Sequence, residues 1–349
     1  MAPRHPDRPH PETVPAGVVP ARKDPAGKDP AGDDLAAYLR AQATEFLRAL
    51  RAQREHGNGA EGAADAGRAL RRSARRISAA LHTFRTLLDP AWADSMRPEL
   101  AWVSGTLALE HAQEARLDRL LLALHRLSGS APAPVRAVVH AGPPAPAPER
   151  GSLTVGAAKA GALLERRLTL ARTRAHSAAL EALGSARFHA VADRVALLAS
   201  DVPLAPGAAT ASLGPLAAAA EDRLAGAVSV LPLVTAGDPY NAQALVHGLS
   251  PDPAPHPQDG PWHQVRLLLR LHRYAREIPH TAPADPRLRA AADALTRHRD
   301  AAEAAAEAAQ AARTPRIAPA TAYALGVLHA DQRHEVEAAR FAFQQTWQS

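Results

Sequence analysis

The sequence contains no cysteine, which excludes disulfide bonds and thiol catalysis. Aromatic residues make up only 4% of the 349 residues, so few side chains are available to stack against nucleic-acid bases. No stretch approaches the roughly 18 consecutive apolar residues that a membrane-spanning helix needs, and residues 1–20 lack the apolar segment of a secretory signal. These absences predict a soluble cytoplasmic protein with no membrane partner.

Familiar catalytic motifs are missing as well. The sequence has neither the GxSxG turn of serine hydrolases nor the HExxH helix of zinc proteases. Gly27-Lys28 lacks the upstream glycine and the following Ser or Thr of a phosphate-binding loop. His329 and His334 are five residues apart, which places them on different sides of a helix. We therefore expect a protein that is not an enzyme, with no catalytic residues, no metal and no cofactor.

Positive charge, by contrast, is in excess. Lys and Arg total 41 against 35 Asp and Glu, which gives a formal net charge of +6, and arginine supplies nearly all of the positive side chains. A guanidinium group is a planar fork of donors that suits phosphate and carboxylate groups. The composition therefore indicates a polyanionic partner without identifying it.

The predicted fold class is all-α. Alanine and leucine dominate the apolar residues, and no strand pattern of any length occurs. Residues 1–33, rich in Pro, Gly and charge, predict a disordered tail, and residues 129–152 and 250–260 predict linkers. Asp33 or Asp34 is expected to cap the first helix, and Pro90 and Pro98 to bracket a turn. The connections suit antiparallel bundles of helices expected over 35–53, 65–88, 99–127, 153–183, 186–200, 212–230, 241–248, 261–278, 285–311 and 320–347.

One face of the helix expected over residues 65–88 is apolar, and the opposite face is basic. Leu70, Ile77 and Phe84 belong to the apolar face. Like charges three and four residues apart on a helix repel, and no glutamate between residues 61 and 99 relieves that repulsion. A solvated amphipathic face is the simpler interpretation, but a bound polyanion would turn the repulsion into attraction. The basic face consists of Arg68, Arg71, Arg72 and Arg75.

The helix expected over residues 261–278 carries arginines among leucines. Trp262, Val265 and four leucines cover most of its circumference, which is typical of a core helix. Arginine is almost never fully buried unless it is paired, and burying an unpaired charge costs several kcal/mol. The pattern therefore predicts that this helix lines a wet groove or channel that holds an anion. Its polar face consists of His263, Arg266, Arg270, Arg273 and Tyr274.

The two basic helices align with each other. A shift of 195 residues places residues 68, 71 and 75 of the first basic face on His263, Arg266 and Arg270. A turn and a long Ala- and Leu-rich helix follow each of them. The chain is therefore predicted to contain two copies of one helical unit.

Several of these segments resemble the CHAD domain, the conserved histidine α-helical domain. Residues 38–42 (YLRAQ) resemble the start of its first helix, and residues 68–76, continuing to FRTLL at 84–88, resemble its first basic helix. Residues 263–274 resemble the family's His-xx-Arg-xxx-Lys-xx-Arg-Tyr helix, and residues 295–300 (LTRHRD) resemble its Leu-Gly-x-His-x-Asp segment. The resemblance covers roughly residues 35–347.

The resemblance implies two antiparallel helical bundles of the four-helix type, related by pseudo-twofold symmetry around a basic central groove or channel. It divides a CHAD-like domain over residues 34–349 into a first bundle, 34–200, and a second, 201–349. It also implies binding of inorganic polyphosphate, a location on polyphosphate granules, and no catalytic device. With the first basic face added, the candidate polyphosphate-binding residues are Arg68, Arg71, Arg72, Arg75, His263, Arg266, Arg270, Arg273 and His298.

The sequence departs from the family pattern mainly in its first half. Arg68 stands where the family has histidine, and residues 107–112 (LALEHA) lack the glycine and aspartate of the corresponding segment. Arg270 replaces the lysine of the second half, which keeps the charge and adds a fork of donors. We therefore expect the first half to bind phosphate more weakly than the second.

Other functions remain open at the level of the sequence. The charge alone fits a non-specific nucleic-acid binder, although stacking aromatics are scarce. A helical adaptor or granule-associated structural protein would use the apolar helix faces. An enzyme acting on polyphosphate would need metal-binding carboxylates, for which Asp300 and Glu303 are the nearby candidates. In a polyphosphate binder, His263 and His298 are expected to protonate readily and to tighten binding at mildly acidic pH.

Overall fold

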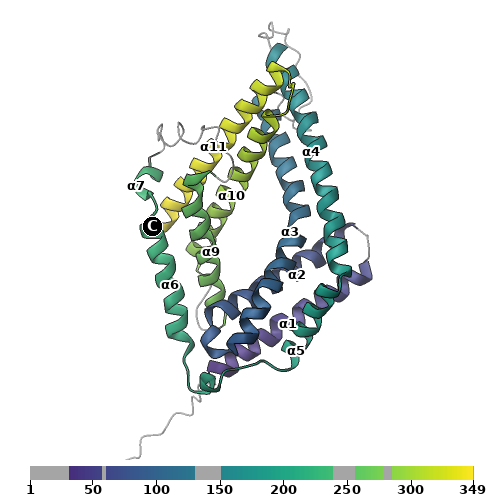
Figure 1. The fold of residues 1–349 in the computed structure, drawn as a ribbon. Coiled ribbons are helices and arrows are strands. Elements are labelled where there is room, and N and C mark those ends of the chain that lie inside the picture. The colour runs from purple at the N-terminus through teal and green to yellow at the C-terminus, as the bar shows by residue number, and fades with distance from the viewer. Residues whose placement is uncertain (1–30, 57–59, 130–150, 239–255, 279–284, 349) are drawn as a thin grey trace, which may run out of the picture.

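A computed structural model describes residues 31–56, 60–129, 151–238, 256–278 and 285–348 of the chain (Figure 1). These residues form helices, and no strand occurs among them, which confirms the all-α fold class. Most of the predicted tail, most of the 129–152 linker and the helix expected at 241–248 lie outside the described residues. The helices are α1 (Ala31–His56), α2 (Ala60–Thr83), α3 (Pro90–Leu127), α4 (Gly151–Gly184), α5 (Ala186–Ser200), α6 (Leu213–Ser229), α7 (Leu233–Ala236), α9 (Gly260–Ala275), α10 (Pro286–Ala312) and α11 (Pro319–Gln348), with single 3-10 turns η1 (Arg85–Leu87), η2 (Pro206–Ala209) and η3 (Pro257–Asp259).

The first helix begins earlier than predicted. α1 starts at Ala31, so the last residues assigned to the disordered tail are helical, and Asp33 and Asp34 lie in the first turn. Neither carboxylate is the predicted N-cap. Acidic side chains in a first turn stabilise a helix because they lie near the positive end of its dipole.

The turn predicted between the two prolines near residue 90 is wrong, because α3 runs through Pro98. The helix starts after Asp89, whose Oδ1 accepts a hydrogen bond from the N–H of Trp92 (2.8 Å). A proline inside a helix costs about 3 kcal/mol. Met96 and Leu100 on either side of Pro98 are fully buried, so core packing at this position outweighs the local preference of the proline.

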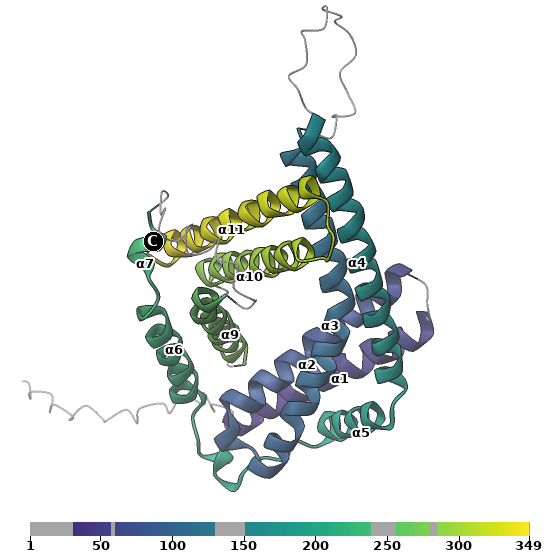
Figure 2. The same ribbon diagram turned by 45° about the horizontal axis from the view of Figure 1, so that its top comes forward.

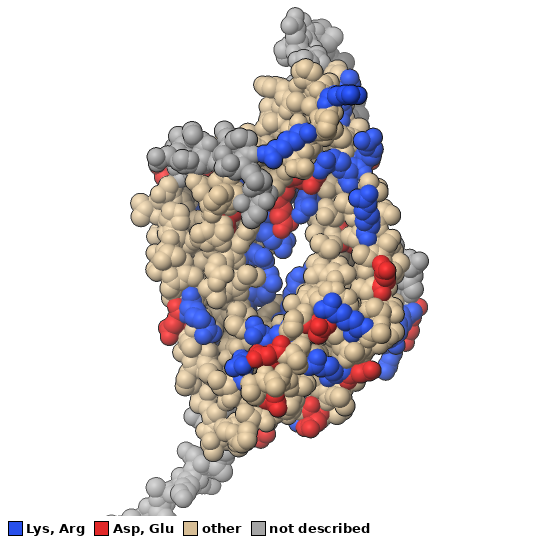
Figure 3. All heavy atoms as spheres, in the orientation of Figure 1, with Lys and Arg blue, Asp and Glu red and all other residues tan. Residues whose placement is uncertain are grey.

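Two groups of helices surround a central opening, which remains when all heavy atoms are drawn (Figures 1, 2 and 3). The first group contains α1 to α5, and the second contains α6, α9, α10 and α11. The groups meet at two places. At one, α2 packs against α9 and α6, and at the other the far ends of α3 and α4 pack against α10 and α11. The helices therefore close into a ring.

Three hydrophobic clusters hold this ring together. The first packs α1, α2, α5 and the start of α3 around Phe46 and Phe84, and it includes Ala275 and Ile278 from the second group. The second joins the far ends of α3 and α4 to α10 and α11, and the third packs α6, α9, α10 and α11 around Trp262 and Phe343. The first two clusters combine helices from both groups. The pseudo-twofold relation and the division at residue 200 remain predictions.

The lengths and hydropathies of the described helices bear on whether the chain could cross a bilayer. None of them is both long enough and apolar enough to span one.

Candidate functional site

Four arginines from two adjacent helices gather at the central opening. Arg71 and Arg75 lie on α2, and Arg266 and Arg270 lie on α9, which packs against α2. The helical period places each pair on one face of its helix. Figure 3 shows lysine and arginine side chains along the rim and inside of the opening. We refer to these four residues as the arginine cluster.

The members of the arginine cluster form no ion pair with a carboxylate of the described residues, although several arginines around them do. Arg76, one position from Arg75, donates Nε and Nη2 to the carboxylate of Glu277 at 2.7 and 3.1 Å. That carboxylate also accepts a hydrogen bond from the hydroxyl of Tyr38 (3.0 Å). Arg76 therefore joins α1, α2 and the end of α9, whereas its neighbour Arg75 has no carboxylate partner among the described residues.

Burial and repulsion from neighbouring arginines lower the pKa of all four guanidinium groups. Burial is the largest cause, and the charge of Arg270 is the next for Arg75 and Arg266, whose pKa values fall to about 10. The pKa values of Arg71 and Arg270 shift in the same direction. Arg299 on α10 adds to the repulsion at each of the four. A pKa near 10 leaves Arg75 and Arg266 charged at neutral pH. The site therefore concentrates positive charge that forms no ion pair with the described carboxylates.

Several buried nitrogen atoms at the site have no hydrogen-bond partner among the described residues. They are Nε of Arg71, Nε of Arg266 and Nε2 of His263. Arg75 differs, because its Nε donates to Oγ of Ser104 on α3 (2.9 Å). A buried polar group without a partner costs about 1–3 kcal/mol. A ligand rich in acceptor oxygens would supply the missing partners.

Two cavities adjoin the arginine cluster. The first, of about 570 Å³, lies between α2, α3, α10 and α11 and is lined by Arg71 and Arg75. The second, of about 500 Å³, lies between α2, α3 and α9 and is lined by Arg75, Arg270 and several leucines. Arg75 lines both, so the two hollows meet at its side chain. Arg266 lines neither, but it lies close enough to Arg75 and Arg270 for their charges to lower its pKa.

The other predicted site residues lie in three different settings. Arg68 and Arg72 are exposed on α2 outside both cavities, and Arg68 forms an ion pair with Asp65. Arg273 is half-buried on α9, where its charge lowers the pKa of Arg270. The structure thus brings Arg71 and Arg75 of the first basic face to the opening. It leaves the exposed Arg68 and Arg72 outside both cavities.

His298 lies inside a buried polar network, with 1% of its surface exposed. Asp259 at the start of α9 accepts hydrogen bonds from Arg333 (2.7 and 3.2 Å) and from Arg340 (2.7 Å). Nε of Arg340 donates to Nε2 of His298 (3.3 Å), and the imidazole stacks on Trp262 with 5.7 Å between ring centres. The network fastens the start of α9 to α10 and α11.

The expectation that His298 protonates readily is wrong. Burial is the largest cause and lowers the pKa of His298 to about 4, with the charge of Arg340 acting in the same direction against the attraction of Asp259. Burial likewise lowers the pKa of His263. A neutral His298 ring is therefore expected at mildly acidic pH, and His298 lines neither cavity. Protonation of His263 beside a bound phosphate stays a prediction.

Some basic residues at the opening escaped the sequence reasoning. The first cavity is also lined by Arg116, Arg119 and Arg126 of α3 and by Arg299 of α10. The α3 residues share a helical face at spacings of three and seven, which is the signal that could have found them. Glutamates in the same helix obscured this stripe, because alternating charges are typical of a solvated face.

No group of three or more histidine and acidic side chains that could hold a metal ion occurs in the part of the chain that the structure describes. The available chemistry is that of guanidinium donors facing a hollow. Such an arrangement binds anions by charge and hydrogen bonds.

Comparisons with known proteins agree with this description. The CHAD domain family matches residues 37–282. A solved structure described as PptA from Streptomyces chartreusis is 68% identical, with a TM-score of 0.77, over 92% of this chain and 100% of that chain. The crystal structure of the CHAD domain from the plant Ricinus communis is 18% identical, with a TM-score of 0.47, over 93% of this chain and 97% of that chain. No curated protein matches the sequence.

Proposed function

Because the chain belongs to the CHAD domain family, we propose that it binds inorganic polyphosphate at the arginine cluster and in the adjoining cavities, without catalysing a reaction. The observation that carries the proposal is the set of half-buried arginines that form no ion pair with any carboxylate of the described residues. Phosphate oxygens accept hydrogen bonds from guanidinium groups in pairs. A chain of linked phosphates repeats that contact from one arginine to the next.

The lining of the two cavities favours polyphosphate over nucleic acid. Proteins that bind single-stranded nucleic acid stack its bases on aromatic side chains. Neither cavity is lined by a phenylalanine, tyrosine or tryptophan. Polyphosphate has no bases and needs only charge and donors. An association with polyphosphate granules in the cytoplasm is part of the proposal, since a bound polymer would hold the protein on them.

Direct binding of long-chain polyphosphate tests the proposal. The variant Arg266→Gln/Arg270→Gln removes two charges from the arginine cluster, and the control Arg51→Gln/Arg54→Gln removes two exposed charges from α1. A hydrogen bond to a charged group contributes about 1.5–3 kcal/mol, so the loss of two weakens binding by about 100-fold or more. The control pair should change affinity only slightly.

The same titrations with RNA and single-stranded DNA as competitors separate polyphosphate from nucleic acid. We expect polyphosphate to displace both. Equal weakening by the two double variants would show that the affinity comes from surface charge in general and would refute the assignment of the site. Measured stability supplies a further check, because removing mutually repelling charges should leave the free energy of unfolding unchanged or higher.

A further inference from the structure

The wall of the first cavity that faces α2 carries both signs of charge. Arg116 of α3 and Arg299 of α10 line it, and so does Glu303 of α10. Nη2 of Arg116 donates to Oε2 of Glu303 (2.7 Å), and Nε of Arg299 lies 3.8 Å from Oε1. Glu303 therefore holds Arg116 by a hydrogen bond and lies near Arg299, whose Nε donates to the carboxylate of Asp300 (2.9 Å) in the same cavity.

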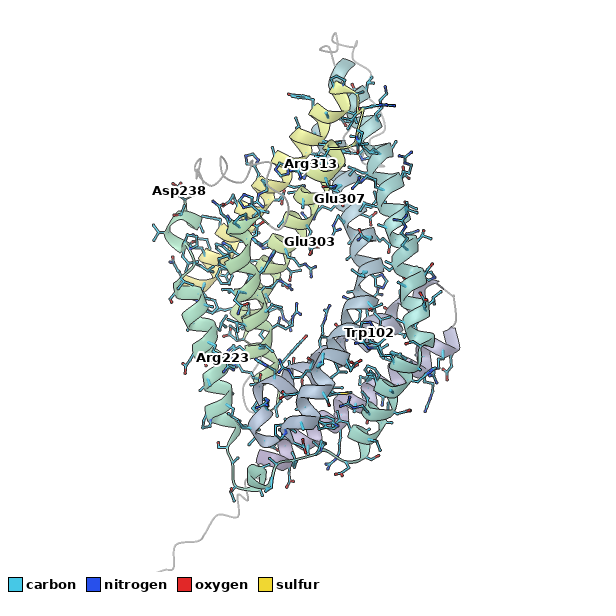
Figure 4. The ribbon with its side chains drawn as sticks, viewed as in Figure 1. Trp102, Arg223, Asp238, Glu303, Glu307 and Arg313 are labelled. Atoms are coloured by element: carbon cyan, nitrogen blue, oxygen red, sulfur yellow. The ribbon has the colours of Figure 1, made fainter. Side chains whose placement is uncertain are left out.

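Glu303 lies where its charge reaches residues of two helices that line the central opening. Figure 4 places it on the side of α10 that faces the opening. Its side chain is 41% exposed, whereas Arg116 is only 17% exposed. Its negative charge opposes the lowering of the pKa of Arg266 and of His263 on α9. The carboxylate thus acts on both the α3 wall and the α9 wall of the opening.

A carboxylate held by a guanidinium group occupies the place that a phosphate would take. Both groups present oxygens with a shared negative charge to the donor forks. Glu303 engages Arg116 and Asp300 engages Arg299, while the arginine cluster forms no ion pair with the described carboxylates. An arriving polyanion therefore meets arginines without a carboxylate partner on one wall and the carboxylate-bound Arg116 and Arg299 on the other.

We propose that Glu303 is an internal competitor of the polyanion, which a long phosphate chain displaces from Arg116 and a short chain leaves in place. The inference rests on the proposed function and names the residue that makes affinity depend on chain length. A short chain fills the arginine cluster and has no phosphate left for the opposite wall. A long chain crosses the cavity and exchanges the contact between Arg116 and Glu303 for a contact with phosphate.

The variant Glu303→Gln tests the inference, because it removes the charge and keeps an oxygen that Arg116 can donate to. Glu307→Gln is the matched control. Glu307 lies one turn further along α10, forms its ion pair with Arg167 of α4 (3.1 Å) and lines neither cavity. Both variants remove one negative charge from the same helix.

Isothermal titration with long-chain polyphosphate and with tripolyphosphate measures the effect. We expect Glu303→Gln to bind the long chain roughly three- to fivefold more tightly, as the loss of a partly exposed competing pair implies. Tripolyphosphate should bind the variant and the wild type alike. Glu307→Gln should match the wild type with both ligands, and Glu303→Gln/Arg116→Gln should lose the gain.

Other outcomes would overturn the inference. If the wild type binds long chains and Glu303→Gln binds them equally or more weakly, Glu303 is a structural tie between α3 and α10. If Glu307→Gln gives the same gain, the effect is one of net charge. If none of these proteins binds polyphosphate, the proposed function itself fails, and the inference with it.

Discussion

Acidification is predicted to destabilise the fold through His298, which the structure buries in a polar network on α10. The imidazole of His298 accepts a hydrogen bond from Arg340 at Nε2, and a ring nitrogen can accept only when it carries no proton. Adding a proton to the folded chain would place a positive charge in a buried site beside Arg340, and the attraction of Asp259 offsets this cost only in part. The unfolded chain, in which the ring is in water, accepts the proton freely.

The size of this destabilisation follows from the proton affinity of His298 in the folded chain compared with that in the unfolded chain. The pKa of His298 falls from 6.5 to about 4 on folding, first because of burial. Each factor of ten in proton affinity corresponds to about 1.4 kcal/mol, which gives about 3 kcal/mol for the whole shift. A lowered pKa means that the unfolded chain binds more protons, so stability is complete above about pH 6.5 and is lost as the pH falls toward about 4.

Titration of Asp259 does not add to the loss of stability between about pH 6.5 and about pH 4. Burial alone would raise its pKa, but contacts with His298 and Arg333 outweigh burial and hold the pKa well below its ordinary value. The stabilisation from Asp259 is therefore present above the pKa of an unfolded aspartate and is lost only at a pH below that value. Loss of stability between about pH 6.5 and about pH 4 reports on histidine.

Urea denaturation of the wild type and of His298→Gln over this pH range is the assay. The difference between the two free energies of unfolding should change by about 3 kcal/mol across the range. The exposed His334→Gln on α11 is the control and should follow the wild type. A His298→Gln protein that loses as much stability on acidification as the wild type would refute the reasoning.

Two further predictions concern contacts that hold the helices together. Asp259→Asn leaves two buried guanidinium groups without their shared carboxylate, so we expect a loss of about 3–5 kcal/mol in urea denaturation; a loss no larger than that of the exposed Asp94→Asn would contradict this. Gly156→Ala would place a Cβ 2.3 Å from the carbonyl oxygen of Ala320, where α4 crosses α11. It should cost about 1–3 kcal/mol, whereas Gly105→Ala, with open space around it, should be neutral or stabilising.

The helices and the arginine cluster could largely be predicted from the sequence, for a physical reason. Apolar residues at helical spacing determine which face of each helix is buried, and this pattern is local. The predicted 261–278 and 285–311 helices accordingly correspond to α9 and α10. Arginines between leucines in α9 could be assigned to a hollow because burial without a partner is so costly.

The remaining features depend on contacts between distant segments. Glu303 and Arg116 are 187 positions apart, so their ion pair has no local signal. The burial of His298 depends on residues of η3 and α11, which the spacing of its own helix does not reveal. Pro98 misled the prediction because a local preference was outweighed by the packing of its neighbours in the core.

The salt dependence of polyphosphate binding tests most directly whether the arginine cluster neutralises phosphates. Each neutralised charge on a single-stranded polyanion contributes roughly 0.7 to the slope of log K against log salt concentration. The account predicts that Arg266→Gln/Arg270→Gln lowers this slope by roughly 1.4 relative to the wild type, while Arg51→Gln/Arg54→Gln leaves it unchanged. An unchanged slope in the first variant would show that the phosphates bind elsewhere and would contradict the account.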